Sequence, residues 1–381
     1  MKEGWEEKKL GDVCKKNSNI KWQKNDETEY QYIDLSSVSR DSLTILETSV
    51  VSSKNAPSRA KKIVEEDDVI FATTRPTLRR VTIIEKDLDN QICSTGFAVM
   101  RANSEKILPQ FIFYFLQTEY FIERMETLQR GASYPAVSDT DVNNSLIPIP
   151  PLSEQKEIVA TLDEAFAAID TAKYNIKKNI ENANELFQSR LNDIFSRKGE
   201  GWEEKRLGDV CENLDRMRIP ITKNIRKSGN IPYYGASGIV DYVDDYIFDE
   251  DLLLVSEDGA NLLARTYPIA FSISGKSWVN NHAHVLKFKN ISSQIFIEYY
   301  LNSIKLDDYV SGMAQPKLNQ KMLNSITVPY PTIDIQEKIV SQLDLLNEDL
   351  EDINEKYQQK LSNLEDLKQS LLQKAFAGEL T

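Results

Sequence analysis

The chain repeats itself, and this repeat limits its possible folds more than any other feature of the sequence. The segment Gly4–Cys14 recurs at Gly201–Cys211 with a single difference, Lys9 against Arg206. Further matches follow at an offset that falls from 197 to 181 residues and then stays fixed; they include Gly131/Gly312, Pro135/Pro316, Pro150/Pro331, Gln155/Gln336 and Phe195/Phe376. A repeat of this kind indicates two copies of one structural unit, each with a part of variable length and a part of fixed length.

The fixed parts are predicted to be long helices. Apolar residues step by four and three along both copies, at Ile158, Leu162, Ala165 and Ile169 and at Ile339, Leu343, Leu346 and Leu350. This is coiled-coil periodicity. Proline-rich runs at 148–151 and 329–331 end any earlier helix, and Ser153 and Asp334 are predicted N-caps. A helix of some 45 residues would be roughly 65 to 70 Å long.

Both periodicities slip by one residue at the same place, between Ile176 and Ile180 and between Tyr357 and Leu361. A shared slip indicates that the two helices pack on each other, because a local change in supercoil must be matched by the partner. If they run antiparallel, the molecule acquires a pseudo-twofold axis and its termini should lie close together. Core packing or dimerisation through a coiled coil is the alternative.

The variable parts, residues 15–130 and 212–311, carry short β-rich runs, and each ends in an amphipathic helix, predicted around Phe111–Met125 and Phe296–Tyr309. The expected fold class is therefore α+β: two globules of similar mixed plan, separated by two long helices that form an antiparallel coiled coil. The β-rich runs are 69–72, 81–84, 97–100, 252–255, 269–273 and 285–288. The expected division is residues 1–150, 151–198, 199–332 and 333–381.

Composition excludes several classes of protein. With 381 residues, 41% hydrophobic and 28% charged, the chain is typical of a folded soluble protein, and no apolar run approaches the roughly 18 residues of a membrane span. We expect a cytoplasmic protein. The three cysteines include no C-x-x-C pair, so they predict neither a disulfide framework nor a zinc site. His282 and His284 lack further ligands nearby, and a polar strand edge is favoured over a metal site.

The sequence contains no phosphate-binding loop, dinucleotide fingerprint, nucleophile elbow or H-E-x-x-H helix. The turn Ser256–Asn261 holds an acidic pair, Glu257 and Asp258, but adjacent carboxylates point apart, so a turn that caps its strand is favoured. We therefore predict no catalytic residue and no metal ligand in this chain.

Basic residues gather in both variable parts, at 54–80 and 216–227, and two glycine-containing loops, 130–135 and 312–317, form a matched pair. Arg, Lys, Asn, Gln and Ser are the side chains that contact phosphates and base edges of DNA. A solvated face is the alternative for each cluster. The net charge of −13 argues against strong DNA binding by this chain alone, because phosphate contacts dominate affinity. Such a DNA reader would need basic partner subunits.

Taken together, these features resemble the specificity subunit of type I restriction-modification systems. The resemblance covers nearly the whole chain: a variable globule, the Ile149–Lys156 hinge, a long helix, the Gly201–Cys211 restart, a second globule with Tyr233–Tyr242, and a final helix ending in 369–380. It implies that each globule is a target-recognition domain that reads one half of an asymmetric, bipartite site in double-stranded DNA. It also implies that the helices fix the spacing and dock two modification (methyltransferase) subunits.

By the same resemblance, restriction subunits with nuclease and translocase activity join the complex, and S-adenosylmethionine, ATP and Mg²⁺ belong to the partner subunits, with no cofactor in this chain. The predicted DNA-binding residues are Arg75, Arg79, Arg80, Arg130, Ser133, Tyr134, Asn261, Lys276, Asn280, Gln315 and Lys317.

Two other functions compete with this one. A non-enzymatic coiled-coil scaffold for protein interactions would show no DNA-dependent behaviour even with its partners present. An autonomous nuclease or methyltransferase would need a phosphate, metal or cofactor site, and none of the corresponding motifs is present.

Overall fold

The computed structural model describes residues 2–23, 27–197, 199, 201–312 and 315–380. The chain forms two compact units: residues 1–176 together with 359–381, and residues 177–358. We call them the first and the second unit. Each contains one globule and parts of both long helices. The finer division into four segments stays a prediction.

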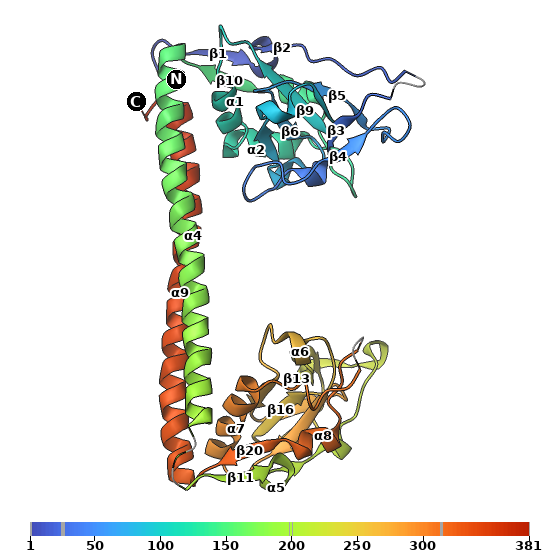
Figure 1. Cartoon of the computed structure of the whole chain (residues 1–381), viewed down its shortest axis with the longest axis vertical. Helices are drawn as coiled ribbons and strands as arrows, with labels where there is room; N and C mark the ends of the chain where they lie inside the picture. Colours follow the sequence, from blue (N-terminus) through green and yellow to red (C-terminus); the bar gives the residue numbers. More distant parts are fainter. Residues whose placement is uncertain (1, 24–26, 198, 200, 313–314, 381) are drawn as a thin grey trace. The chain divides into compact units, whose positions relative to one another are not determined.

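The first unit is built from short strands and helices that precede the first long helix (Figure 1). Its strands are β1 Glu6–Lys9, β2 Cys14–Lys15, β3 Tyr30–Ile33, β4 Ser49–Val51, β5 Ala60–Val64, β6 Val69–Ala72, β7 Val81–Ile83, β8 Gln91–Ser94, β9 Phe97–Ala102 and β10 Leu146–Ile149. Its helices are α1 Pro109–Phe115, α2 Glu119–Leu128 and α3 Asp139–Asn143.

These strands form two main sheets. One is antiparallel, in the order β2-β9-β6-β7; the other has the order β4-β3-β8-β5 and pairs β3 with β8 in parallel. Strand β6 is buried throughout, as its continuous apolar sequence predicts. Phe71 of β6 packs on Phe121 of α2, with ring centroids 5.1 Å apart, so the helices cover this sheet and close the core.

The second unit repeats this plan. Its strands are β11 Glu203–Arg206, β12 Glu212–Asn213, β13 Ser228–Gly235, β14 Gly238–Val243, β15 Phe248–Asp249, β16 Leu252–Ser256, β17 Ala270–Ile273, β18 Lys276–Val279, β19 Ala283–Lys287 and β20 Thr327–Tyr330. Its helices are α5 Leu207–Val210, α6 Asn261–Ala264, α7 Ile291–Ser303 and α8 Gln320–Ser325. The sheet orders, β12-β19-β16-β17 and β14-β13-β18-β15, correspond strand for strand to those of the first unit.

The predicted long helices are confirmed as α4, Leu152–Ser196, and α9, Ile333–Ala377, each 45 residues long. In the first unit the first half of α4 lies beside the second half of α9: Leu162 and Leu372 share a core, and Lys173 and Glu365 form an ion pair of 2.6 Å. In the second unit the late turns of α4 share a core with the early turns of α9, through Leu191 and Leu343. The pairing is therefore antiparallel, as expected (Figure 1).

Both helices are attached to the globules at their ends in matching ways. Phe376 of α9 packs on Phe111 of α1 at 4.8 Å, and Phe195 of α4 packs on Phe296 of α7 at 5.4 Å. Beyond α9, Gly378 adopts a positive φ of +78° and lies against Lys2, because a Cβ at this glycine would be 2.7 Å from the Cβ of Lys2. The two termini are thus close, as the antiparallel arrangement requires.

Several local predictions were wrong. Ser153 and Asp334 are not N-caps, because α4 begins at Leu152 and α9 at Ile333, so both residues lie in the first turn. The predicted helix 111–125 is two helices, since Thr118 accepts a hydrogen bond from the Phe121 N–H and caps a new helix there. Helix α7 ends at Ser303, short of Tyr309. None of the helices in the described residues combines the length and apolar character of a membrane crossing.

Candidate nucleic-acid interface

In the first unit, the turn that joins β6 to β7 meets the loop that precedes α3. Residues 73–80 and 130–136 are here called the first loop cluster. Backbone hydrogen bonds hold the two segments together: the Arg75 N–H donates to the Pro135 carbonyl at 2.7 Å, and the Val137 N–H donates to the Thr73 carbonyl at 2.9 Å. Isolated bridges add Thr74 to Ala136 and close the loop between Arg130 and Ala136.

The second unit has the corresponding backbone hydrogen bonds and bridges, which together we call the backbone frame. The Gly259 N–H donates to the Pro316 carbonyl at 3.0 Å, and the Leu318 N–H donates to the Glu257 carbonyl at 2.8 Å. Isolated bridges pair Asp258 and Ser311 with Lys317. The second loop cluster consists of residues 257–265 with 311, 312 and 315–317; Met313 and Ala314, which belong to the predicted loop, lie outside the described residues. The two clusters share a backbone and differ in side chains.

Arg75 and Tyr134 are exposed and in contact with each other in the first loop cluster. The Tyr134 side chain is 71% exposed, and the Arg75 guanidinium lies 5.1 Å from the centre of its ring. This is a cation–π contact, which orients a guanidinium without neutralising it. Ser133 is exposed beside them.

The other predicted arginines of this cluster are engaged within the protein. Arg79 donates to both carboxylate oxygens of Glu119 on α2 at 2.6 Å, and Arg80 donates to the Leu35 carbonyl. Arg130 donates to Asp141 at 2.8 Å, and this hydrogen bond holds the pKa of Asp141 well below its ordinary value. These contacts fix the shape of the cluster.

In the second unit the predicted residues fall into exposed and buried groups. Gln315 and Lys317 are exposed, and Lys317 pairs with Glu257 at 3.1 Å. Lys276 on β18 is exposed and lies 4.6 Å from the ring centre of Tyr246. Asn261 and Asn280 are only 7% and 6% exposed.

Both buried asparagines hold backbone in place. Asn261 accepts the N–H of Thr266 at 2.9 Å and donates to the carbonyl of Tyr267, so it shapes the turn after α6. Asn280 accepts the N–H of His282 at 2.7 Å. Their role as DNA contacts, like that of the other predicted residues, stays a prediction.

Sequence reasoning missed a buried charged network beneath the second loop cluster. Arg218 donates to Glu257 at 2.6 Å, and His284 contacts Asp215 at 2.7 Å and the Leu318 carbonyl at 2.7 Å. Burial tends to raise the pKa of Glu257, but the hydrogen bond from Arg218 and the neighbouring charges hold it below its ordinary value. The i,i+3 spacing of Asp215 and Arg218 was the available signal, but their partners are distant in sequence.

The sequence predicts no metal or disulfide role for the histidines and cysteines, and the structure shows what each of them contacts. His282 and His284 have different partners, since the His282 ring contacts Asp258 at 2.9 Å. Glu257 and Asp258 point apart, as expected of neighbours in a turn. In the described ranges, no group of three or more His, Cys, Asp or Glu side chains could hold a metal ion. Cys14, Cys93 and Cys211 are free, and burial raises the pKa of each thiol to about 12.

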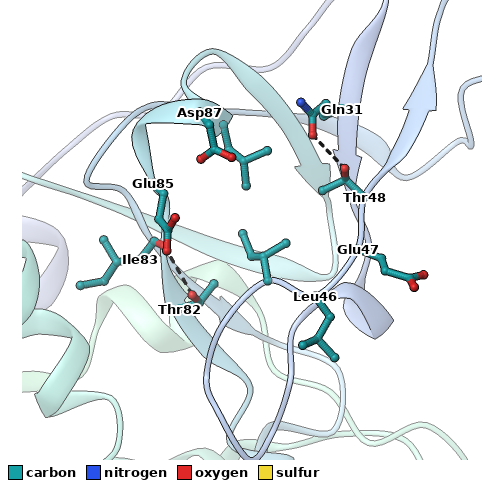
Figure 2. A pocket seen from close by; sticks show the side chains of 10 residues that line it. Gln31, Leu46, Glu47, Thr48, Thr82, Ile83, Glu85 and Asp87 are labelled. Carbon is teal, nitrogen blue, oxygen red and sulfur yellow. Dashed lines mark hydrogen bonds between the residues drawn. The ribbon is translucent and has the colours of Figure 1, made fainter. Parts of the chain in front are cut away.

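A hollow of about 180 Å³ in the first unit has the wrong charge for DNA (Figure 2). Glu47, Glu85 and Asp87 line it, together with the apolar side chains of Leu46 and Ile83. Several residues that line the hollow come at the end of β7 or after it, whereas the first loop cluster comes before that strand. The hollow therefore lies at the other end of β7. Three carboxylates repel a phosphate backbone, and the loop clusters therefore remain the better candidate interface.

The family model described as "Type I restriction modification DNA specificity domain" matches residues 2–182 and again 199–363. The StySPI specificity subunit of Salmonella potsdam is 23% identical over 366 residues, covering 86% of this chain and 78% of that protein. Two specificity-subunit relatives from Haemophilus influenzae are 37% and 30% identical, but the chain spans only about a third of their length, 37% and 34%.

Two solved structures are similar over the full length. One comes from work described as "Structural basis underlying complex assembly and conformational transition of the type I R-M system". It is 28% identical, with a TM-score of 0.86, and the match covers 100% of this chain and 99% of that chain. The HsdS subunit from Thermoanaerobacter tengcongensis is also 28% identical, with a TM-score of 0.62 and coverage of 100% and 98%. The two family matches correspond to the two halves of the repeat and cover most of the chain. The chain belongs to the family of type I restriction-modification specificity subunits.

Proposed function

We propose that this chain is the sequence-reading, non-catalytic subunit of a type I restriction-modification complex. Each globule reads one half of a bipartite, asymmetric site in double-stranded DNA. The paired helices α4 and α9 fix the spacing between the half-sites and dock two methyltransferase subunits. Restriction subunits complete the assembly.

One observation carries this proposal: the two loop clusters share a backbone frame but present different side chains. The same carbonyl-to-amide bonds hold Arg75 to Pro135 in one unit and Gly259 to Pro316 in the other. Side chains, rather than the frame, distinguish base pairs in direct readout. A repeated frame with unlike side chains therefore suits a protein that reads two unlike half-sites.

The charge balance supports a role inside a larger complex. A net charge of −13 is unfavourable for a chain that binds DNA by itself, because counterion release at the phosphates supplies most of the affinity. We propose that the partner subunits supply the basic surface around the DNA. S-adenosylmethionine, ATP and Mg²⁺ then act in those subunits.

Methylome sequencing tests the proposal. Cells that carry the intact locus are compared with cells that lack only this gene, and with deleted cells complemented by it. We expect one bipartite methylated motif to disappear on deletion and to return on complementation. An unchanged set of methylated motifs, in cells whose methyltransferase is active, would contradict the proposal and favour the protein-interaction scaffold.

A domain exchange separates the two globules. Residues 15–147 are replaced by the corresponding segment of another specificity subunit, and the chimaera is expressed with the same partner subunits. One half of the methylated motif should change while the other half and the gap stay the same. A change in both halves would show that the globules do not read independently.

A further inference from the structure

We propose that Arg75, oriented by Tyr134, reads a guanine in the half-site of the first unit. This inference rests on the proposed function and goes further, because it assigns one residue to one kind of base. It is drawn from the comparison of the two loop clusters within this chain.

The backbone at Arg75 does not require an arginine. Arg75 has φ 52° and ψ 60°, in the left-handed region that residues other than glycine rarely adopt. Its counterpart in the second unit is Gly259, which makes the same hydrogen bond and also has a positive φ, +114°. Glycine is thus the residue that suits this turn. Arg79 of the same turn has a similar φ of 54°, but its side chain is paired with Glu119, so the state of its side chain is what distinguishes Arg75.

The guanidinium of Arg75 is available to a ligand. Within the residues that the structure describes, it forms no hydrogen bond or ion pair, and its one described contact is the ring of Tyr134. The neighbouring Arg79, Arg80 and Arg130 are instead engaged by Glu119, the Leu35 carbonyl and Asp141. Arg75 therefore differs from them in having its donors free at an exposed position.

The ring of Tyr134 restricts how the guanidinium can turn. A planar fork held against an aromatic face keeps its edge N–H groups free and loses less entropy when it binds. Guanine presents two acceptors, O6 and N7, on its major-groove edge, and this pair matches the fork in a bidentate contact. A phosphate can form the same bidentate contact, but it carries no sequence information, so the measurements below separate the two ligands. At the position of Tyr134 the second unit has Gln315, so it lacks this aromatic support.

The test uses Arg75→Gly and Arg75→Lys in the complete complex, with Arg40→Ala as a control on another exposed arginine of the same unit. Arg75→Gly copies the residue of the second unit, and glycine accommodates the positive φ of 52° at this position without strain. We expect both Arg75 variants to lose preference at one G·C position of the methylated motif, by about 10- to 100-fold, with every other position unchanged. The control should leave the motif unaltered.

A second measurement identifies the atom. DNA with 7-deazaguanine at that position lacks the N7 acceptor. It should bind the wild-type complex more weakly than normal DNA does, whereas the Arg75→Gly complex should bind both alike. An unaltered motif, a change at an A·T position, or an equal loss at all sites would overturn the assignment. If the wild-type complex methylates no bipartite motif at all, the proposed function itself fails.

Discussion

His284 shows how a single buried residue can control the position of a loop. Its side chain is 1% exposed, and each ring nitrogen lies 2.7 Å from an oxygen, on Asp215 and on the Leu318 carbonyl. The Leu318 carbonyl can only accept a hydrogen bond, so the ring donates to it. Burial would raise the pKa of Asp215, but the hydrogen bond from His284 outweighs burial, and the pKa of Asp215 lies below its ordinary value. These two hydrogen bonds hold Leu318 beside the second loop cluster.

Replacing this ring should destabilise the second unit. His284→Ala leaves Asp215 with the Val285 N–H as a donor but leaves the Leu318 carbonyl without the ring N–H, and an unsatisfied buried group costs about 1–3 kcal/mol. We expect thermal or denaturant unfolding to show a loss of this size. His282→Ala is the matched control, since its side chain is 52% exposed and should cost less than about 1 kcal/mol. Equal losses for both variants would contradict the assigned role of His284.

The lowered pKa of Asp215 also predicts how stability depends on pH. Because the carboxylate is favoured in the folded state, it contributes stability above the ordinary value of 3.8, and this stability is lost as pH falls through the folded pKa. The unfolding free energies of the wild-type chain and of Asp215→Asn should therefore differ most near neutral pH and converge as the pH falls below 3.8 and through the folded pKa. Asp87→Asn, at an exposed carboxylate, controls for the general effect of acid. A constant difference across this range would refute the prediction.

Residue types alone could identify the loop clusters but could not assign a role to each residue. Arg75 and Arg79 look alike in the sequence, yet one is free and the other is paired with Glu119, 40 residues away. Asn261 and Asn280 have the side chains that read adenine, but both are buried and bonded to backbone. These outcomes depend on partners that are distant in the chain, and no local pattern encodes them.

At the scale of elements, two equivalent glutamines fix the start of each long helix. Gln155 on α4 is fully buried; it accepts the Leu108 N–H at 2.9 Å and donates to the carbonyls of Lys106 and Pro150. Gln336 on α9 is also fully buried, and it bonds to Ser293 and to the Pro331 carbonyl. The same residue therefore joins helix, proline hinge and globule in both units.

Removal of this side chain should loosen the joint. Gln155→Ala would remove the partner of one backbone N–H and of two carbonyls, of which that of Pro150 makes a buried contact, at a cost of about 1–3 kcal/mol for an unsatisfied buried group. We expect unfolding measurements to show a loss of at least about 2 kcal/mol. Gln188→Ala, at an exposed glutamine of the same helix, should change stability by less than about 0.5 kcal/mol. A loss no larger than that of the control would argue against the joint.

The elements were predictable to different degrees. Heptad periodicity predicted α4 and α9 as helices of some 45 residues, because a long pattern averages out local exceptions, but the predicted N-caps were wrong. The paired short strands β1–β10 and β11–β20 were not predicted, since each is four residues long and finds its partner more than 100 residues away. The break at Thr118 was missed because the apolar pattern continues across it.

At the scale of the whole molecule, each long helix begins against one globule and ends against the other. Gln155 fixes the start of α4 in the first unit, and Phe195 inserts the end of α4 between Phe296 and Tyr300 of the second. In α9 the order is reversed, from Gln336 to Phe376. This arrangement suits a spacer of fixed length, which the proposed function requires.

Lengthening both helices together tests the spacer directly. One heptad copied from each helix is inserted between Ile176 and Lys177 and between Gln358 and Gln359, at the boundary of the two units. A heptad preserves the packing register and adds about 10 Å, which equals at most about three base pairs of DNA. Methylome sequencing should then show both half-motifs unchanged and a longer gap between them. An insertion into α4 alone should instead mismatch the pair and lower the melting temperature. An unchanged gap in a complex that still methylates with the double insertion would mean that the helices do not set the spacing.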